Sequence, residues 1–134
     1  MILVDTSIWI ELLNKRVGVM PSPDDVLRFV TCSPVVQEVL QGLRESRDAA
    51  SFREAFLAVP VLSDPLPLRT FLEAAEIYRQ GRRRGCTIRS STDCLIAAIA
   101  IENNVPVWHK DRDFALIRDF TPLRTIDLLP RSAA

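Results

Sequence analysis

Short apolar segments alternate along this chain with segments of helical periodicity, and this alternation limits the possible folds more than any other feature. Residues 2–4 are all apolar and the run stops at Asp5, which is typical of a parallel strand buried on both faces. Residues 5–7 then offer polar side chains that can cap a helix over residues 8–13. A strand that leads at once into a capped helix begins a βαβ unit. The pattern therefore predicts an α/β fold, with a mainly parallel sheet and helices on both faces.

The rest of the chain continues this pattern. Asp24 and Asp25 can lie in a loop that leads into a second strand, or they can open a short helical turn before that strand. Further strands are expected at residues 26–31, 59–63, 105–108 and 123–128, and further helices at 34–44, 48–58, 67–84, 93–103 and 113–119. The long helix is expected to end at Gly85. Its buried stripe is expected to comprise Leu68, Leu72, Ala75, Ile77 and Tyr78.

Size and composition indicate one globular domain over residues 1–134, with 130–134 as a frayed tail. The chain has 134 residues, of which 48% are hydrophobic and 25% charged, as in ordinary globular proteins. No apolar run reaches the ~18 residues of a membrane span. No basic leader precedes an apolar stretch, so we expect a cytoplasmic protein with no membrane partner. The three cysteines lack C-x-x-C spacing, which favours reduced thiols over structural zinc.

Acidic residues lie where the expected strands meet the helices. Asp5 follows the first strand, and Asp111 and Asp113 follow the strand at 105–108. Asp93 begins the helix before that strand, and Glu38 lies one turn into the helix at 34–44. Ligands of open parallel sheets bind at the carboxyl ends of strands, near the point where strand order reverses. These side chains are therefore expected to face one cleft if the two strands are neighbours.

Carboxylates gathered in this way repel one another unless a cation or a proton neutralises them. Oxygen ligands alone favour Mg²⁺ or Mn²⁺ over zinc. A divalent ion can activate water for attack on phosphorus, and a second ion can stabilise the leaving oxygen. The pattern therefore predicts phosphodiester hydrolysis.

Each acid also has a purely structural interpretation. Asp5 can cap the first helix, and Asp93 can be an acid favoured by the dipole of its helix. Solvated surface positions are the alternative for Glu38, Asp111 and Asp113. The sequence contains neither G-x-x-x-x-G-K-[ST] nor G-x-G-x-x-G, so nucleotide-binding loops find no support.

Four segments, in order and across essentially the whole chain, resemble the motifs of PIN-domain proteins, and in particular of the VapC toxins of bacterial toxin–antitoxin pairs. They are residues 5–11 (DTSIWIE), 34–42 (PVVQEVLQG), 92–98 (TDCLIAA) and 105–114 (VPVWHKDRDF). The resemblance implies a three-layer α/β/α sandwich around a parallel sheet of four or five strands. It also implies an endoribonuclease that depends on Mg²⁺ or Mn²⁺, forms a homodimer and is neutralised by a small VapB-type antitoxin, often through an arginine placed in the acidic pocket.

The resemblance assigns roles to single residues of this chain. The carboxylates that face the metal would be Asp5, Asp93 and Asp111, with Asp113 as an additional acid. Glu38 would join them through a water molecule. The polar neighbours of the cluster would be Thr6 and Thr92.

His109 stands where many relatives have threonine, two positions before Asp111. It is the single histidine of the chain, so no Ser-His-Asp arrangement stands out. Two interpretations remain open for it. It is either a structural residue with satisfied hydrogen bonds, or a contact to Asp111 or to a substrate phosphate.

The formal net charge is zero, so RNA would have to bind a local basic patch. The densest basic run comprises Arg82, Arg83, Arg84 and, close behind, Arg89. These arginines could serve as favourable charges at the C-terminus of a helix. They could equally clamp the phosphates of RNA beside Asp93.

Two other function classes compete with a ribonuclease. One is a binding module that has lost catalysis, which the presence of all four acidic positions disfavours. The other is a phosphatase-like enzyme acting on small molecules, whose acidic centre would look similar in sequence.

Overall fold

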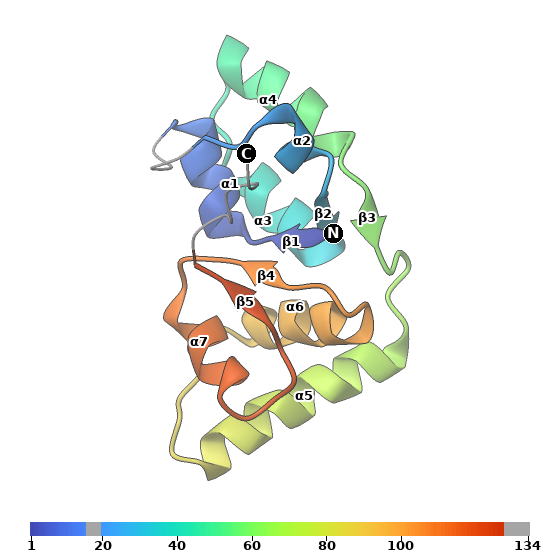
Figure 1. Ribbon diagram of the computed structural model, residues 1–134, viewed down its shortest axis with the longest axis vertical. Helices are drawn as coiled ribbons and strands as arrows, with labels where there is room; N and C mark the ends of the chain where they lie inside the picture. The colour runs from blue at the N-terminus through green and yellow to red at the C-terminus, as the bar shows by residue number, and fades with distance from the viewer. Residues whose placement is uncertain (16–19, 128–134) are drawn as a thin grey trace.

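The strands form one five-stranded sheet in the computed structural model, which describes residues 1–15 and 20–127 (Figure 1). They are β1 (Ile2–Val4), β2 (Phe29–Cys32), β3 (Val61–Leu62), β4 (Val107–Trp108) and β5 (Thr125–Ile126). Their order is β3-β2-β1-β4-β5, and every pairing is parallel. Leu3, at the centre, lies opposite Val30 on one side and Val107 on the other. The predicted parallel sheet is thus confirmed, with five strands.

The helices fall into two groups, one on each side of the sheet (Figure 1). They are α1 (Thr6–Leu13), α2 (Pro23–Val26), α3 (Ser33–Gly42), α4 (Arg47–Leu57), α5 (Leu68–Arg83), α6 (Ser91–Glu102) and α7 (Arg112–Arg118). Helix α1 packs on α3, whereas α5, α6 and α7 pack on one another. Right-handed crossovers place the helices on opposite faces because the chain moves from β1 to β3 in one direction and from β4 to β5 in the other. The expected three-layer α/β/α sandwich is confirmed.

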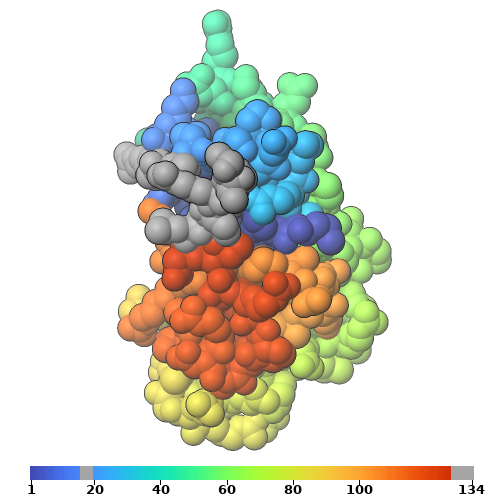
Figure 2. All heavy atoms as spheres, viewed as in Figure 1, coloured from blue at the N-terminus to red at the C-terminus, as the bar shows by residue number. Residues whose placement is uncertain are grey.

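The same division is visible on the surface. In Figure 2 the atoms of the first part of the chain, blue to teal, occupy the upper half of the face shown, and the yellow, orange and red atoms of the later part occupy the lower half. Strand β1 of the first half and strand β4 of the second half pair with each other. The middle of the sheet is therefore where the two halves of the chain meet.

The second strand begins later than the pattern predicts. Residues 23–26 form α2 because Ser22 and Asp25 make a reciprocal capping box, so β2 starts only at Phe29. The helical turn and the strand therefore both exist. The last strand is also shorter than expected, and residue 128 and the expected tail at 130–134 lie outside the described residues.

The predicted buried stripe of α5 is correct for Ile77, which is buried, and for Tyr78, which is partly buried against the core, but wrong for Leu68, Leu72 and Ala75. Leu68 and Leu72 are 73% and 62% exposed, and Phe71 between them is 46% exposed. The buried residues of this helix are Thr70, Ala74, Ile77 and Gly81. Three of these four side chains are small or absent, which lets α5 approach α6, and hydrophobicity alone does not reveal such a face. Gly85, with φ of +75°, follows the end of α5 as predicted.

Helix α6 lies at the centre of the lower half in Figure 1, between the sheet and α5. Its residues 96–100 are fully buried, as expected for a helix that is apolar on all sides. Its first turn, which contains Asp93, is therefore held rigidly at the edge of the core. Within the described residues, no helix is both long and apolar enough to cross a lipid bilayer.

Candidate functional site

The acidic residues lie at the point where the strand order reverses. Because β1 pairs with β4, the carboxyl ends of these two strands lie side by side. Asp5 follows β1 directly, and Asp111 follows β4 after two residues. From the sequence, these two residues were expected to converge only if their strands are neighbours. The structure shows that the strands are neighbours. Such a reversal point is where open α/β sheets bind their ligands.

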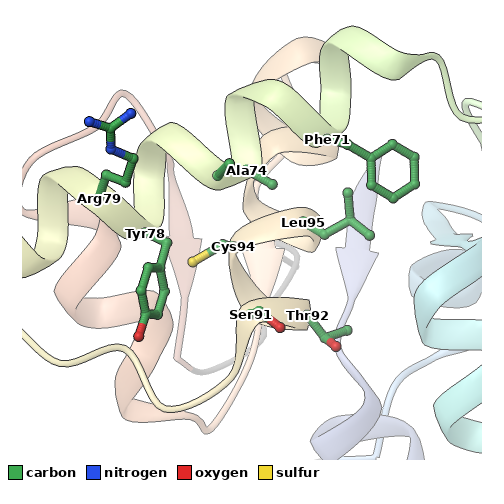
Figure 3. Close-up of a pocket in the computed structure, with 9 residues that line it drawn as sticks. Phe71, Ala74, Tyr78, Arg79, Ser91, Thr92, Cys94 and Leu95 are labelled. Atoms are coloured by element: carbon green, nitrogen blue, oxygen red, sulfur yellow. The ribbon is translucent and has the colours of Figure 1, made fainter.

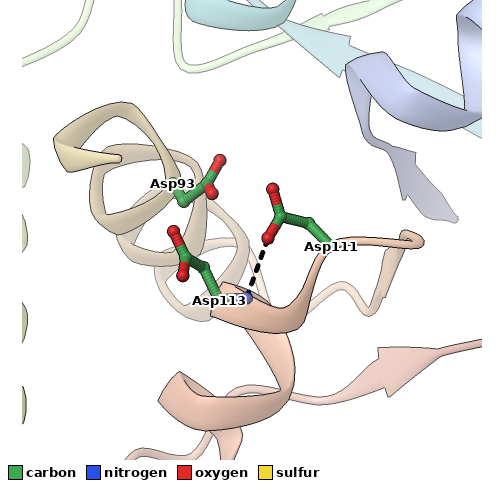
Figure 4. A group of neighbouring side chains, drawn as sticks. All are labelled: Asp93, Asp111 and Asp113. Atoms are coloured by element: carbon green, nitrogen blue, oxygen red, sulfur yellow. Dashed lines mark hydrogen bonds between the residues drawn. The ribbon is translucent and has the colours of Figure 1, made fainter. Parts of the chain in front are cut away.

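Three aspartates form the tightest group at this edge. One carboxylate oxygen from each of Asp93, Asp111 and Asp113 lies within 4.8 Å of the others (Figure 4). Asp93 comes from the first turn of α6, Asp111 caps α7, and Asp113 lies in the first turn of α7. Asp93 is 6% exposed and Asp113 is 1% exposed. We call these three residues the aspartate trio.

Backbone hydrogen bonds hold the trio in place. Asp111 Oδ1 accepts the backbone N–H of Asp113 at 2.9 Å, and Asp113 Oδ2 accepts that of Ser90 at 3.1 Å. Among the described residues, Asp93 Oδ2 and Asp113 Oδ1 are buried without a hydrogen-bond partner. Buried carboxylate oxygens that lack a partner are costly, so these two atoms are suited to bind a cation.

Asp5 flanks the trio without belonging to it. Its Oδ2 accepts the hydroxyl of Ser7 at 2.7 Å and the backbone N–H of Ser7 at 3.3 Å. It therefore caps α1, as its structural interpretation proposed. Only 5% of Asp5 is exposed, and burial raises its pKa despite these hydrogen bonds. Capping and a place in the acidic site are thus compatible, because α1 begins at the same edge of the sheet.

Glu38 faces the same site from α3. Its Oε1 accepts the hydroxyl of Thr6 at 3.2 Å, which joins α3 to the first residue of α1. Burial raises the pKa of Glu38, and the negative charges of Asp5 and Asp111 raise it further. Thr6 is therefore a polar neighbour of the acidic residues, in the position that the sequence motif implied.

The carboxylates cannot all be ionised easily without a cation. Burial raises the pKa of Asp93 to about 9, and the charges of Asp5 and Asp111 contribute to this shift. A divalent ion would remove the repulsion and satisfy the buried oxygens that lack a partner. The donor set consists of oxygen atoms, which hard cations prefer. The residues present therefore fit a divalent metal ion.

Among the described residues, neither the Thr92 nor the His109 side chain forms a hydrogen bond with a carboxylate of the aspartate trio. Thr92 lines the hollow between α5 and α6, and within the described residues its hydroxyl has no hydrogen bond to a carboxylate. His109 is 3% exposed and packs on Phe114, with ring centroids 5.2 Å apart. Neither of its ring nitrogens has a hydrogen-bond partner within the described residues, and burial lowers its pKa. Its Nε2 lies 3.7 Å from Asp127 Oδ1, and the negative charges of Asp127, Asp5 and Asp111 oppose the lowering of its pKa.

The arginine run lies at the C-terminal end of α5 and just beyond it. Arg83 forms an ion pair of 2.6 Å with Glu76, and the guanidinium of Arg82 lies over the ring of Tyr78. Arg84 lies over Phe120 in the same way. All three side chains are exposed, as is Arg89. They are accessible to a ligand, although Arg83 already has an acidic partner.

Two serines that sequence reasoning did not assign to the site contact its carboxylates. Ser7 was considered only as a helix cap, yet its hydroxyl also accepts the backbone N–H of Lys110 at 3.4 Å. Ser90 supplies the N–H that binds Asp113. The D-T-S order at residues 5–7 is the one sequence signal that could have indicated Ser7. The role of Ser90 depends on a backbone group, which no side-chain pattern reveals.

Comparison with known proteins identifies this arrangement. The family model described as "PIN domain" matches residues 2–119, which contain Asp5, Glu38 and the aspartate trio. The chain belongs to the PIN-domain family. This PIN domain is 33% identical to Ribonuclease VapC11 of Mycobacterium tuberculosis and to a VapC ribonuclease of Mycobacterium bovis, over 92% of this chain and 96% of each relative.

Solved structures agree with this PIN-domain assignment at the level of the fold. The chain in the structure of VapBC2 from Rickettsia felis, bound to a promoter DNA fragment, aligns with a TM-score of 0.71 and 19% identity, over 94% of this PIN domain and 98% of that chain. VapBC-5 of Mycobacterium tuberculosis aligns with a TM-score of 0.68 and 22% identity, over 92% and 95% of the two chains.

Proposed function

We propose that this PIN domain is the toxin of a toxin–antitoxin pair and acts as an endoribonuclease that requires Mg²⁺ or Mn²⁺. The observation that carries the proposal is the aspartate trio, whose buried oxygens lack partners at the reversal point of the sheet. The 33% identity to VapC ribonucleases over nearly the whole chain supports RNA as the substrate. The similarity to VapBC structures supports an antitoxin as partner, and a cytoplasmic location and a homodimer are proposed as the family resemblance implies.

In this proposal each residue of the site has a separate role. The aspartate trio supplies the oxygen ligands, and Asp5 adds negative charge beside them. A bound divalent ion supplies the positive charge that lets a phosphodiester approach these carboxylates, and it eases the ionisation of water. Glu38, held by Thr6 through one oxygen, keeps its other oxygen available to orient a water molecule toward phosphorus. The reaction breaks a phosphorus–oxygen bond of the RNA backbone and adds water across it.

The test is an RNA cleavage assay with Mg²⁺, with Mn²⁺ and with EDTA. Cleavage is expected with either ion and not with EDTA. Asp5→Asn should lower kcat by at least ~100-fold, since it removes one charge from the site. Asp24→Asn is the matched control because Asp24 is exposed on α2, and this variant should cleave like the wild type.

The other function classes have distinct outcomes in the same assay. Cleavage that survives EDTA or Asp5→Asn contradicts the metal mechanism. Hydrolysis of small phosphomonoesters without RNA cleavage would indicate a phosphatase. RNA binding without any cleavage would indicate a binding module. For the partner, the product of an adjacent short gene should co-purify with this chain and suppress cleavage.

A further inference from the structure

A hollow of about 450 Å³ opens next to the acidic site, between α3 and the N-terminal ends of α5 and α6. Its wall includes Glu38 of the site itself and Thr92, the residue before Asp93. We call it the α3–α5 pocket. A second hollow, of about 510 Å³, runs between α5 and α6 and shares Phe71, Thr92 and Leu95 with it (Figure 3). The α3–α5 pocket is thus the part of a longer groove that reaches Glu38 of the acidic site.

The apolar wall of the α3–α5 pocket includes an accessible aromatic ring. Phe71 projects from α5 at one end of the groove in Figure 3 and is 46% exposed. Leu66 and Leu95 are partly buried beside it and line the same pocket. A half-exposed phenyl ring over an apolar floor offers a flat surface on which a planar ligand can stack.

The opposite wall of the pocket offers a pair of amides. Gln37 Nε2 donates a hydrogen bond of 2.9 Å to Gln41 Oε1 on the next turn of α3. This bond orients the two amides and leaves the carbonyl oxygen of Gln37 and the NH₂ group of Gln41 available. The pocket therefore presents a hydrogen-bond acceptor and donors side by side, opposite an apolar wall.

The charge of the lining excludes a phosphate as the occupant of this pocket. Among the described residues that line it, Glu38 is the only ionisable one, and it is acidic. A phosphate would be repelled by Glu38, whereas an uncharged ring with polar edges would not. The chemistry fits a nucleobase, since single-stranded RNA is recognised by stacking on aromatic side chains and by hydrogen bonds to base edges.

We propose that the α3–α5 pocket receives an unpaired nucleobase next to the scissile phosphodiester, stacked on Phe71 and contacted at its polar edge by Gln37 and Gln41. This inference rests on the proposed ribonuclease function, because the phosphate attached to that nucleotide would lie at the aspartate trio. The continuity of the pocket with Glu38 and Thr92 brings the base and the phosphate to one site. Phe71 would then favour unpaired RNA, because only an unpaired base can leave its partner strand to stack on the ring.

The experiment starts from the linkage that the wild type cleaves in a single-stranded RNA of mixed sequence. That RNA is then synthesised with an abasic spacer at each position around the linkage, one position at a time. We expect one flanking position at which removal of the base lowers kcat/KM about tenfold, the size of one stacking interaction. Phe71→Ala should lower kcat/KM for the intact RNA by a similar factor and abolish the abasic penalty, whereas Phe71→Tyr should retain it.

Leu72→Ala is the matched control. Leu72 is the next residue of α5 and is 62% exposed, but it does not line the pocket. This variant should keep the abasic penalty of the wild type. The double variant Gln37→Leu/Gln41→Leu should keep the penalty too, but should lose any preference among the four bases at that position.

A second measurement does not depend on cleavage. RNA that carries 4-thiouridine at the sensitive position is cross-linked to the protein in EDTA, and the protein is digested with trypsin. Cross-links are expected in the peptides that carry the pocket wall, residues 29–44, 54–69, 70–79 and 90–110. Cross-links confined to other peptides would contradict the proposal.

The remaining outcomes separate this inference from the proposed function. A wild-type enzyme that cleaves RNA but tolerates an abasic spacer at every flanking position overturns the base pocket alone. The same holds if Phe71→Ala keeps the full penalty. If Phe71→Ala alters only the molar mass measured by light scattering, the surface is an interface between copies of this chain and the proposal is wrong. A wild type that cleaves no RNA overturns the proposed function itself.

Discussion

The hydroxyl of Ser7 lies 2.7 Å from Oδ2 of Asp5 and holds this carboxylate at the end of β1. The same hydroxyl accepts the backbone N–H of Lys110, in the loop that follows β4. The Lys110 side chain forms an ion pair of 2.6 Å with Glu11 of α1, which ties the loop down a second time. Strand pairing aligns only the backbones of β1 and β4. Ser7 adds a side-chain contact that fixes the orientation of the Asp5 carboxylate relative to the trio.

Ser7→Ala should lower activity without unfolding the protein. A hydrogen bond to a charged group contributes about 1.5–3 kcal/mol, which corresponds to a fall in kcat/KM of roughly tenfold or more. The substitution also removes a hydrogen bond that lowers the pKa of Asp5. The measurement is RNA cleavage across a range of pH, with Ser51→Ala on the exposed side of α4 as control. Equal activity in both variants would show that Ser7 does not position Asp5.

Metal binding should depend on pH through Asp93. The pKa of Asp93 is raised to about 9 in the folded protein without metal, from an ordinary value of 3.8. Between these values the folded state holds a proton that the unfolded chain has released. The contribution of Asp93 to the free energy of unfolding therefore falls as pH rises from about 4 to about 9. The buried His109, whose pKa is lowered, contributes in the opposite direction as pH rises toward its ordinary range.

A metal ion binds the ionised carboxylate and so competes with this proton. The rise in Tm caused by Mg²⁺ or Mn²⁺, relative to EDTA, should therefore be larger at about pH 9 than at about pH 6. Thermal melts with and without the ion at each pH measure this rise in Tm. In Asp93→Asn the rise in Tm caused by the metal should be small at every pH. A rise in Tm that is constant across pH in the wild type would contradict the competition between the metal and the Asp93 proton.

Asp113 allows a structural role to be separated from a role in metal binding. Its Oδ2 accepts the N–H of Ser90, while its Oδ1 has no partner among the described residues. Asp113→Asn keeps an acceptor for Ser90 and removes the charge, so it should weaken metal binding in calorimetric titration but leave Tm in EDTA unchanged or raised. Asp113→Leu should lower stability by about 1–3 kcal/mol, because it leaves the N–H of Ser90 unpaired. Wild-type metal affinity in Asp113→Asn would mean that Asp113 is only structural.

The arginines at the end of α5 should contribute to RNA affinity by binding phosphates. Arg82→Ala/Arg83→Ala should weaken binding and flatten its dependence on salt, by about 0.7 in the log–log slope for each phosphate that is no longer neutralised. Arg82 should contribute more than Arg83, whose charge is already paired with Glu76. Fluorescence anisotropy at several salt concentrations measures the slope. The control is Arg28→Ala, which removes a cation already paired with Asp25. An unchanged slope in the double variant would exclude phosphate binding by Arg82 and Arg83.

The elements were largely predictable because their signals are local. Asp5 caps α1, Gly85 follows the end of α5, and the apolar run of α6 is buried, each in accordance with a pattern of neighbouring residues. The face of α5 was not predictable in this way. Its exposed leucines and its buried small residues depend on how closely α6 approaches, which is a contact between segments distant in sequence.

The sequence by itself determined which residues end strands and begin helices, and therefore that acidic side chains would stand at the carboxyl ends of the strands. Only the tertiary structure decided that β1 lies beside β4, that Asp93, Asp111 and Asp113 form the close group, and that Asp5 flanks them. The physical reason is the distance along the chain over which the deciding interactions act. Helix caps and periodicity arise from interactions within a few residues, whereas strand order and the distances between carboxylates depend on the packing of the whole core.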